Sequence, residues 1–447
     1  MNRDHPSNAR RLWALLLALL LVACQRDTQT PPPTSATVTS APQLPATRPA
    51  STATPQASAT AGEFAFLPAI SDAITFTPTP SPSPAPSLTP SPTPPAFPPY
   101  EGPVLDRTRL GVQIYLHRAD LDPILNHVTD LGAGWVKVQV SWKVYQPEPD
   151  AYDDWRLREL DHLVSGATGR GLQVLLSVAK APEWSRPTTE EDGPPQDFVL
   201  FRDFMEYLAG RYQGNVAAYE LWNEPNLQRE WNGMPLSAAE FVRLVEHGAA
   251  GVRAGDDRAL IISGAPATTG VNDGVVAIDD RRYLRAMLAA GIGDIVDGLG
   301  VHPYGWANSP GASASDAQPS APTHNDHPSF FFSDTLRQYR AVLEETGYEH
   351  LLLWSTEFGW GSFEGFGTQP PPEAQFMAHV SEWQQAQYTQ EALALLHDWP
   401  GMGPVFLWNL NFAPVIGAGF SESGYSLLRP DGSRRPVYLA LQNIPKQ

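Results

Sequence analysis

The sequence contains a single cysteine, Cys24, among its 447 residues. A lone cysteine excludes an internal disulfide, a cysteine-based zinc site and an iron–sulfur cluster. Basic residues are also scarce: 30 Lys and Arg stand against 48 Asp and Glu, which gives a formal net charge of −18. Because an acidic surface repels phosphate backbones, we expect no nucleic-acid partner.

Phosphate-binding and metal-binding patterns are missing as well. The sequence has no G-x-G-x-x-G or G-x-x-x-x-G-K-[ST] loop, and its 11 histidines are scattered without an H-x-x-x-H pair. The acidic clusters Asp153-Asp154 and Glu190-Glu191-Asp192 resemble solvated loops. We therefore expect no metal and no cofactor.

No apolar run near the N-terminus is long enough to cross a membrane. Arg10 and Arg11 precede an apolar run from Leu12 to Ala23, whereas a bilayer core of ~30 Å needs about 20 helical residues. A short apolar run after positive charges is typical of a secretory signal. It ends Leu21-Val22-Ala23-Cys24, which resembles the bacterial lipobox, so residues 1–23 are predicted to be removed and Cys24 to be lipidated. The alternative is an ordinary signal peptide with an incidental cysteine.

Residues 24–100 are rich in Pro, Thr and Ser, as in Ser81-Pro82-Ser83-Pro84. Such a segment has too little apolar area to offset chain entropy. We predict a disordered, extended linker that tethers the folded part to a membrane through the lipid, which places the protein outside the cell at the cell surface.

The folded part, residues 101–447, alternates short apolar runs with helical patterns. The runs begin roughly 25–55 residues apart, the spacing of a strand plus a crossover helix. They are Leu110–Tyr115, Trp135–Val140, Leu172–Val178, Ala217–Trp222, Leu260–Ser263, Val296–Val301, Leu351–Ser355 and Val405–Trp408. Eight such units predict an α/β fold, a single (β/α)₈ TIM barrel. An open doubly wound sheet is the alternative, and the missing Gly-rich turn disfavours it.

Two glutamates stand at the ends of predicted strands, where barrel enzymes place their working residues. The fourth strand leads into Trp222-Asn223-Glu224-Pro225-Asn226, and the seventh into Thr356-Glu357-Phe358. Two carboxylates that flank one cavity are what glycoside hydrolysis requires. The alternative is two unrelated acidic residues that cap helices or face solvent.

On these residues, the segment from about 103 to 443 resembles the clan of retaining glycoside hydrolases with catalytic glutamates after strands 4 and 7, clan A. The resemblance implies that Glu224 is the general acid/base and Glu357 the nucleophile. It implies that Asn223 binds the sugar 2-hydroxyl. In His302-Pro303-Tyr304 the tyrosine would hydrogen-bond the nucleophile, and both His302 and Tyr304 are predicted to be substrate-binding residues. For His302 alone, a core histidine is the alternative, which its place in the motif disfavours.

The family within the clan stays open at this point. Trp231 and the run Ser263-Gly264-Ala265-Pro266-Ala267 are similar to family 39, the β-xylosidases and their relatives. Trp142, followed by Gln146-Pro147-Glu148-Pro149, is similar to several families, including the family 5 cellulases.

One residue departs from the clan pattern. Many members carry an arginine on strand 2, where this chain has Lys137. Strands 2 and 4 both contribute to the even-strand layers inside a barrel, and buried charges are rarely left alone. We therefore predict that Lys137 pairs with Glu220 below the site, at a distance under about 5 Å.

Several tryptophans fall at or just after strand ends, where a flat ring can pack on a sugar face. They are Trp142, Trp184, Trp231, Trp306, Trp360 and Trp408. The resemblance favours Trp408 as the platform under the reacting sugar, with Trp142 and Trp184 as further contacts. Ordinary core packing is the alternative for each of them.

These observations predict a lipid-tethered retaining β-glycosidase that acts on an oligosaccharide or polysaccharide outside the cell, and we expect a monomer. Two alternatives remain: a non-catalytic carbohydrate-binding lipoprotein, and a transglycosidase that uses the same two glutamates. Acceptor choice depends on how loops exclude water, so the sequence does not separate hydrolysis from transfer.

Overall fold

The computed structural model describes residues 99–116, 120–316 and 321–447 of the chain. The predicted signal peptide, Cys24 and nearly all of the predicted linker lie outside the described residues. The folded unit runs from Ala96 to Gln447.

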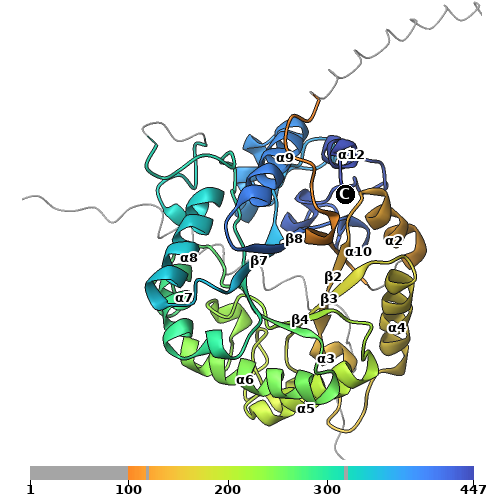
Figure 1. The fold of residues 1–447 in the computed structure, drawn as a ribbon, viewed down its shortest axis with the longest axis vertical. Coiled ribbons are helices and arrows are strands. Elements are labelled where there is room, and N and C mark those ends of the chain that lie inside the picture. The colour runs from red at the N-terminus through yellow and green to blue at the C-terminus, as the bar shows by residue number, and fades with distance from the viewer. Residues whose placement is uncertain (1–98, 117–119, 317–320) are drawn as a thin grey trace, which may run out of the picture. The chain divides into compact units, whose positions relative to one another are not determined.

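Eight parallel strands form a closed barrel in chain order, with each strand paired to the next and β8 paired to β1. Figure 1 shows the strands at the centre of a ring of helices. The strands are β1 (Leu110–Ile114), β2 (Trp135–Ser141), β3 (Gln173–Ala179), β4 (Ala218–Leu221), β5 (Leu260–Ser263), β6 (Gly298–Val301), β7 (Leu352–Phe358) and β8 (Met402–Leu407). The predicted (β/α)₈ barrel is confirmed.

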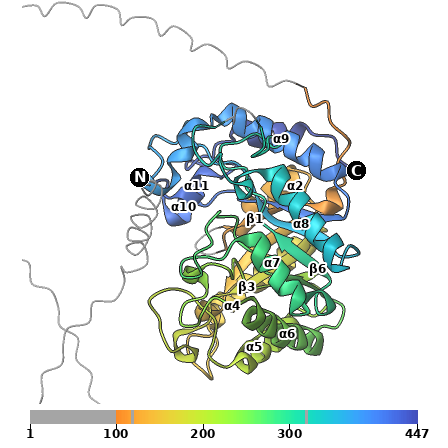
Figure 2. The same ribbon diagram turned by 90° about the vertical axis from the view of Figure 1, so that its left-hand side faces the viewer.

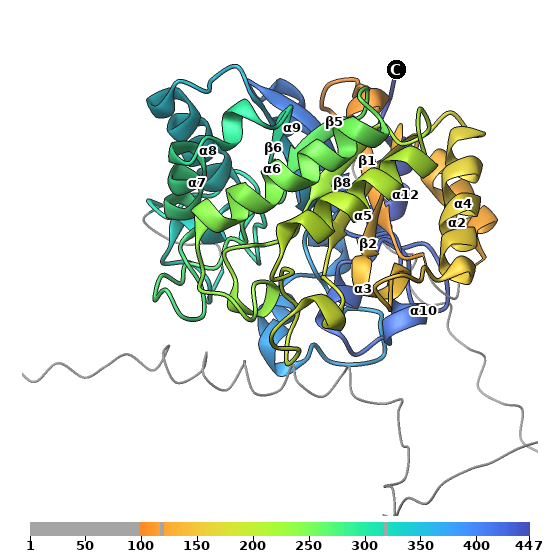
Figure 3. The same cartoon turned by 90° about the horizontal axis from the view of Figure 1, so that it is seen from below.

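The helices follow the strands as crossover connections. The α-helices are α2 (Leu121–Asp130), α3 (Trp142–Tyr145), α4 (Asp154–Thr168), α5 (Phe198–Arg211), α6 (Ala238–Gly255), α7 (Asp280–Ala289), α8 (Phe332–Thr346), α9 (Glu382–Asp398), α10 (Ala413–Ile416), α11 (Ser421–Gly424) and α12 (Pro436–Asn443). Short 3₁₀ turns are η2 (Arg107–Arg109), η3 (Glu183–Ser185), η4 (Gln228–Glu230), η5 (Ile292–Asp294), η6 (Pro328–Phe330) and η7 (Pro372–His379). Figure 3 shows α5 and α6 side by side on one flank of the barrel.

Helix α5 illustrates how the sequence builds these elements. The Asp197 carboxylate caps it by accepting a hydrogen bond from the Val199 N–H. Phe201, Phe204 and Leu208 then recur at helical spacing and are buried. The helix thereby covers the strands with one apolar face.

An apolar layer fills the barrel interior near its amino end. It consists of Trp135, Leu175, Ala218, Ile262, Trp354 and Phe406. Glycine makes room for these rings, because a Cβ on Gly298 would lie 2.7 Å from the Trp354 ring. Side chains alternate along a strand, so the residues two positions on, Lys137 and Glu220, also face the interior, one layer nearer the carboxyl ends.

The first and last described segments meet at the amino end of the barrel. The Leu105 N–H donates to the Pro445 carbonyl, and the Arg107 N–H donates to the Gln447 carbonyl. Figure 2 shows the first described segment beside the C-terminus. In Figure 3, α3 and α10, which follow β2 and β8, lie at the opposite end from the C-terminus.

No helix within residues 99–116, 120–316 and 321–447 is long and apolar enough to cross a membrane.

Candidate active site

The loop after β4 holds Glu224 in an uncommon backbone conformation. Trp222 has φ +77° and Glu224 has φ +42°, values that non-glycine residues rarely adopt. The Glu224 N–H donates to the Ala265 carbonyl at 3.0 Å, which ties this loop to the segment after β5. Backbone strain of this kind concentrates at functional sites, where surrounding contacts impose it.

Asn226 supplies most of that restraint. Its amide nitrogen donates to the carbonyls of Ala267 and Ile278 at 2.9 and 2.8 Å, and its amide oxygen accepts from the Ala267 N–H at 2.7 Å. The side chain is completely buried. Asn226, the second asparagine of the Trp-Asn-Glu-Pro-Asn run, therefore ties the Glu224 loop to the segment between β5 and α7.

Glu357 is the penultimate residue of β7, because this strand extends to Phe358, beyond the predicted end at Ser355. The Tyr304 hydroxyl donates to Glu357 Oε2 at 2.9 Å, as the resemblance implied for this tyrosine. Lys137 Nζ donates to Glu357 Oε1 at 3.4 Å. Both carboxylate oxygens are thus held by donors from the barrel wall.

His302 lies between the two glutamates. Its Nδ1 is 3.2 Å from Glu224 Oε1 and 3.9 Å from Glu357 Oε2, so these two oxygens are within about 7 Å of each other. Burial disfavours the charged ring, but the carboxylates of Glu357 and Glu224 outweigh it and raise the pKa of His302. The ring is fully buried, so His302 contacts the carboxylates from behind rather than lining an open subsite as a sugar contact.

The predicted pair beneath the site is confirmed: Lys137 Nζ lies 2.9 Å from Glu220 Oε2, and both side chains are completely buried. Lys137 also donates to the Thr356 carbonyl at 3.0 Å. Burial opposes the ammonium form, yet Glu220 and Glu357 together raise the pKa of Lys137. The lysine therefore belongs to the site as well as to the structural layer below it.

Glu224 has two cationic partners. Besides His302 at Oε1, Arg229 of η4 places Nη2 3.0 Å from Glu224 Oε2. Burial disfavours the carboxylate, but the hydrogen bond from His302 and the charge of Arg229 outweigh it and lower the pKa of Glu224. These two partners thus favour the carboxylate form of Glu224.

Aromatic rings flank Glu357. Trp408 is half-buried and packs edge-on against Tyr304, with ring centroids 6.0 Å apart. Tyr425, directly after α11, contacts both rings. Burial, with Glu422, Glu224 and Glu357 nearby, raises the pKa of Tyr425 above its usual range. The structure therefore brings Trp408 to the carboxylates and adds Tyr425, which the sequence analysis missed because no strand end marks it.

The structure packs Trp142 into the core, and its predicted sugar-contact role stays a prediction. Its ring is fully buried, stacks on Phe204 at 5.2 Å and donates its N–H to the Gln146 side chain. Trp231 and Trp360 are buried in the same way. A tryptophan just after a strand packs into the helix layer when large apolar side chains surround it, as they do here.

Trp184 and Asn223 are placed differently from Trp142. Trp184 is half-buried, donates to the Gln146 carbonyl and meets Trp142 edge-on, so its contacts lie in the loops after β2 and β3. Asn223 is buried next to Glu224, and its amide oxygen has no hydrogen-bond partner among the described residues. A substrate role stays a prediction for both.

A charged cluster beside Glu224 was also missed. Lys180, directly after β3 with φ +65°, lies 2.9 Å from Asp192, and Lys143 lies 2.6 Å from the same carboxylate. Buried Glu230, next to Arg229, completes the cluster; its burial raises its pKa to about 7. Lys180 stands at a strand end, and that position was the available signal.

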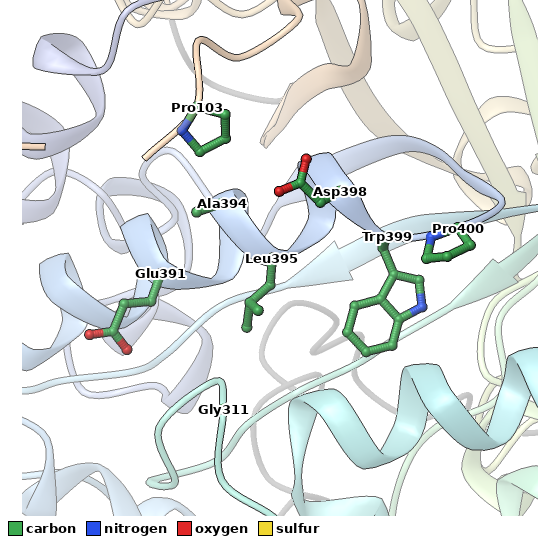
Figure 4. A pocket seen from close by; sticks show the side chains of 8 residues that line it. All are labelled: Pro103, Gly311, Glu391, Ala394, Leu395, Asp398, Trp399 and Pro400. Carbon is green, nitrogen blue, oxygen red and sulfur yellow. The ribbon is translucent and has the colours of Figure 1, made fainter. Parts of the chain in front are cut away.

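The most prominent groove described on the barrel does not belong to this site. This groove lies between the C-terminal half of α9, Pro103 and Gly311, as Figure 4 shows, and none of its lining residues is one of the glutamates or their partners. Within the described part of the chain, no cluster of three or more His, Cys, Asp or Glu side chains is arranged to hold a metal ion.

Comparison with known proteins gives a family match and a set of similar folds. The model of the cellulase family, glycosyl hydrolase family 5, matches residues 108–383. No curated protein matches the chain.

Among solved structures, a family 39 glycoside hydrolase from Bacteroides cellulosilyticus has a TM-score of 0.55 and 19% identity over 77% of this chain and 65% of its own, just under two thirds of its length. A GH5_18 protein from Streptomyces cattleya, in complex with GlcNAc, has a TM-score of 0.53 and 18% identity over 76% of this chain and 80% of its own. Endoglucanase Cel5A from Thermotoga maritima has a TM-score of 0.50 and 14% identity over 75% of this chain and 98% of its own. At these identities the likeness is one of fold.

Proposed function

Because the chain belongs to glycosyl hydrolase family 5, we propose that it hydrolyses β-glycosidic bonds of an oligosaccharide or polysaccharide with retention of configuration. Glu224 is the general acid/base and Glu357 the nucleophile. The observation that carries the proposal is the pair of glutamates from β4 and β7 that share His302. One oxygen of each carboxylate lies within about 7 Å of the other, an upper bound that allows the 5–5.5 Å spacing of retaining enzymes.

The reaction proceeds in two displacements. Glu224, protonated, gives its proton to the glycosidic oxygen while Glu357 attacks the anomeric carbon, and the leaving sugar departs as an alcohol. Glu224, then ionised, takes a proton from water, which attacks the same carbon and releases Glu357. The two inversions give net retention.

The partners of Glu357 suit a nucleophile. Lys137 and Tyr304 donate to its two oxygens and favour its negative charge before attack. Trp408 and Tyr425 stand beside Tyr304 and offer apolar faces to the sugar ring that Glu357 attacks. The unpartnered amide of Asn223 is available to a sugar hydroxyl.

The test is turnover of a panel of aryl β-glycosides (xyloside, glucoside, galactoside, mannoside and arabinoside) and of soluble β-glucan and β-mannan by the full chain. Wild type is compared with Glu357→Gln and with Glu349→Gln, a control on an exposed glutamate. We expect wild type and control to release product with the anomeric configuration retained by NMR, and Glu357→Gln to be inactive. Inverted product would refute the mechanism, and binding of a glycan without turnover would favour a non-catalytic binding protein.

We further propose that the protein is exported and held at the cell surface by a lipid on Cys24. The lipobox-like residues before Cys24 and the Pro-rich linker support this. In a bacterial host, wild type should incorporate labelled palmitate and sediment with membranes, and Cys24→Ser should do neither. Equal sedimentation of both forms would contradict the anchor.

A further inference from the structure

Both oxygens of the Glu224 carboxylate are occupied in the free site. His302 Nδ1 lies 3.2 Å from Oε1, and Arg229 Nη2 lies 3.0 Å from Oε2. A general acid must hydrogen-bond the glycosidic oxygen through one of these two atoms. A glycosidic oxygen that approaches Oε2 therefore competes with Arg229 for that atom.

Arg229 is the partner that can leave. His302 is fully buried and is also 3.9 Å from Glu357, so it has no room to withdraw. The Arg229 side chain is 51% exposed and stands on the short turn η4. Partly exposed ion pairs contribute little stability, so the displacement of Arg229 from Glu224 costs little free energy. The glycosidic oxygen then takes the place of Arg229 at Oε2, and the guanidinium remains on the leaving-group side of the scissile bond.

The displacement also makes Glu224 a better acid. Arg229 favours the ionised form of Glu224, so moving its positive charge away raises the pKa of Glu224 towards the value that proton donation requires. The other titratable groups that face Glu224 stay in place. They are His302 and Tyr304 after β6, Glu357 on β7, Tyr425 after α11, and Glu230 on its own loop.

Apart from Glu224, the acidic side chains near Arg229 are bonded elsewhere or attract it less. Asp192 is already bonded by Lys143 and Lys180, at 2.6 and 2.9 Å. Glu230, whose burial raises its pKa to about 7, carries a proton for much of the time near neutral pH. Glu422 attracts Arg229 less than Glu224 and Glu230 do. An Arg229 guanidinium displaced from Glu224 would therefore lack a bonded carboxylate of its own, and an anion on the substrate could supply one.

Arg186 adds a further donor to the charged cluster beside Glu224. It interacts with Asp192, and its Nε is buried without a hydrogen-bond partner among the described residues. Its Nη2 donates to the Glu191 and Asn232 carbonyls and to the Asn232 side chain, which are all neutral. A guanidinium matches a carboxylate by two parallel hydrogen bonds, which a lysine cannot provide.

We propose that Arg229 is a specificity-determining residue that binds a carboxylate on the leaving group, as in a glycan whose leaving sugar is a uronic acid. The proposal rests on the function proposed above, because it assumes that Glu224 protonates the leaving oxygen. An acidic leaving group pairs with Arg229, removes it from Glu224 and so switches the general acid on. A neutral leaving group must also displace Arg229 from Glu224, but it forms no ion pair with Arg229 in return.

The test uses two aryl β-glycosides of the sugar that wild type releases fastest. One carries 4-hydroxybenzoate as leaving group, and the other carries its methyl ester, so the pair differs by one negative charge. We expect wild type to favour the carboxylate in kcat/KM, and Arg229→Met to lose about 10- to 100-fold on the carboxylate alone, the worth of a charged hydrogen bond. Arg229→Lys should recover part of the preference. Arg243→Ala, an exposed arginine on α6, is the control.

A second readout separates recognition from a structural role. In wild type, the basic limb of the kcat/KM profile should lie at higher pH with the carboxylate than with the ester. In Arg229→Met it should lie at the higher pH with both. Equal loss on both substrates, or an unchanged preference, would overturn the proposal. If wild type hydrolyses the ester and Glu357→Gln does not, the proposed function stands even when the leaving-group proposal fails.

Discussion

Lys137→Met is the most informative perturbation of this barrel. The wild-type ammonium group lies 2.9 Å from Glu220, 3.4 Å from Glu357 and 3.0 Å from the Thr356 carbonyl. The side chains of Lys137 and Glu220 are fully buried, and that of Glu357 is 9% exposed. Methionine keeps most of the length of the side chain and removes only its charge, so it leaves two buried carboxylates without their shared cation.

The expected loss follows from this burial. Removing one partner of a buried ion pair costs about 3–5 kcal/mol, and two stranded carboxylates place this variant at the upper end. Because domains have a net stability of about 5–15 kcal/mol, the variant should still fold but unfold at lower denaturant concentration. Lys143→Met is the matched control: its ammonium also bonds a carboxylate but is 39% exposed, and its loss should be under about 1 kcal/mol.

The double variant Lys137→Met/Glu220→Met separates charge from packing. Replacing both members of a buried pair by apolar residues of similar size is often neutral, so much of the lost stability should return. Activity should not return, because Glu357 still lacks its lysine. Urea unfolding at constant m-value measures the first effect, and kcat/KM on the best aryl glycoside measures the second.

The pH dependence has a definite sign. Glu220 and Glu357 raise the pKa of Lys137 despite its burial, so its contribution to stability is complete below the unfolded-state pKa and fades only as pH rises through the folded-state value. The difference between wild type and Lys137→Met should therefore be the same at pH 6 and pH 8. A loss below about 1 kcal/mol, or a double variant no more stable than the single one, would refute a coupled buried pair.

Three further outcomes are expected. Tyr304→Phe removes the hydroxyl that donates to Glu357 and should lower kcat/KM by about 10- to 100-fold with little change in unfolding free energy. Asn226→Ala strands three buried backbone groups, so urea unfolding should show a loss of at least about 2 kcal/mol, and kcat should fall as the Glu224 loop loosens. Glu230 has a folded pKa of about 7, above the ordinary value of 4.5, so its ionisation destabilises the fold as pH rises from about 4.5 to 7. The unfolding free energy of Glu230→Gln should therefore rise by up to about 3 kcal/mol relative to that of wild type between pH 5 and pH 8. A difference between the two proteins that does not change with pH would contradict the raised pKa.

Features set by periodicity along the chain were predictable. Each of the eight apolar runs overlaps a strand, because a buried parallel strand is a short apolar segment bounded by turns. Because even-numbered strands share the interior layers of a barrel and buried charges are rarely left alone, the pairing of Lys137 with Glu220 was also predictable. The position of Glu224 and Glu357 at the barrel mouth follows from the same count of strands.

The surroundings of individual side chains were not predictable, because they depend on residues that are distant in the sequence. Trp142 and Trp408 both stand at strand ends, yet one is sealed by Phe204 and the other is half-buried beside Tyr304. Nothing in the local sequence distinguishes them, because the difference lies in which helix or loop packs over the ring. Arg229 is likewise an ordinary surface arginine in the sequence, and its contact with Glu224 depends on the unusual turn between β4 and α6.

The two glutamates differ most in how firmly their partners are held. Both partners of Glu357 come from the barrel wall, Lys137 on β2 and Tyr304 just after β6, so its charge is supported in the same way throughout a catalytic cycle. Glu224 has one buried partner and one half-exposed partner. The proposed mechanism asks Glu224, and not Glu357, to donate a proton in one step and accept one in the next. A movable cation suits the residue that must change protonation state, and fixed hydrogen-bond donors suit the residue that must begin as an anion. Variants of Arg229 should therefore shift the pH profile and leaving-group preference, whereas variants of Lys137 should reduce stability and activity together.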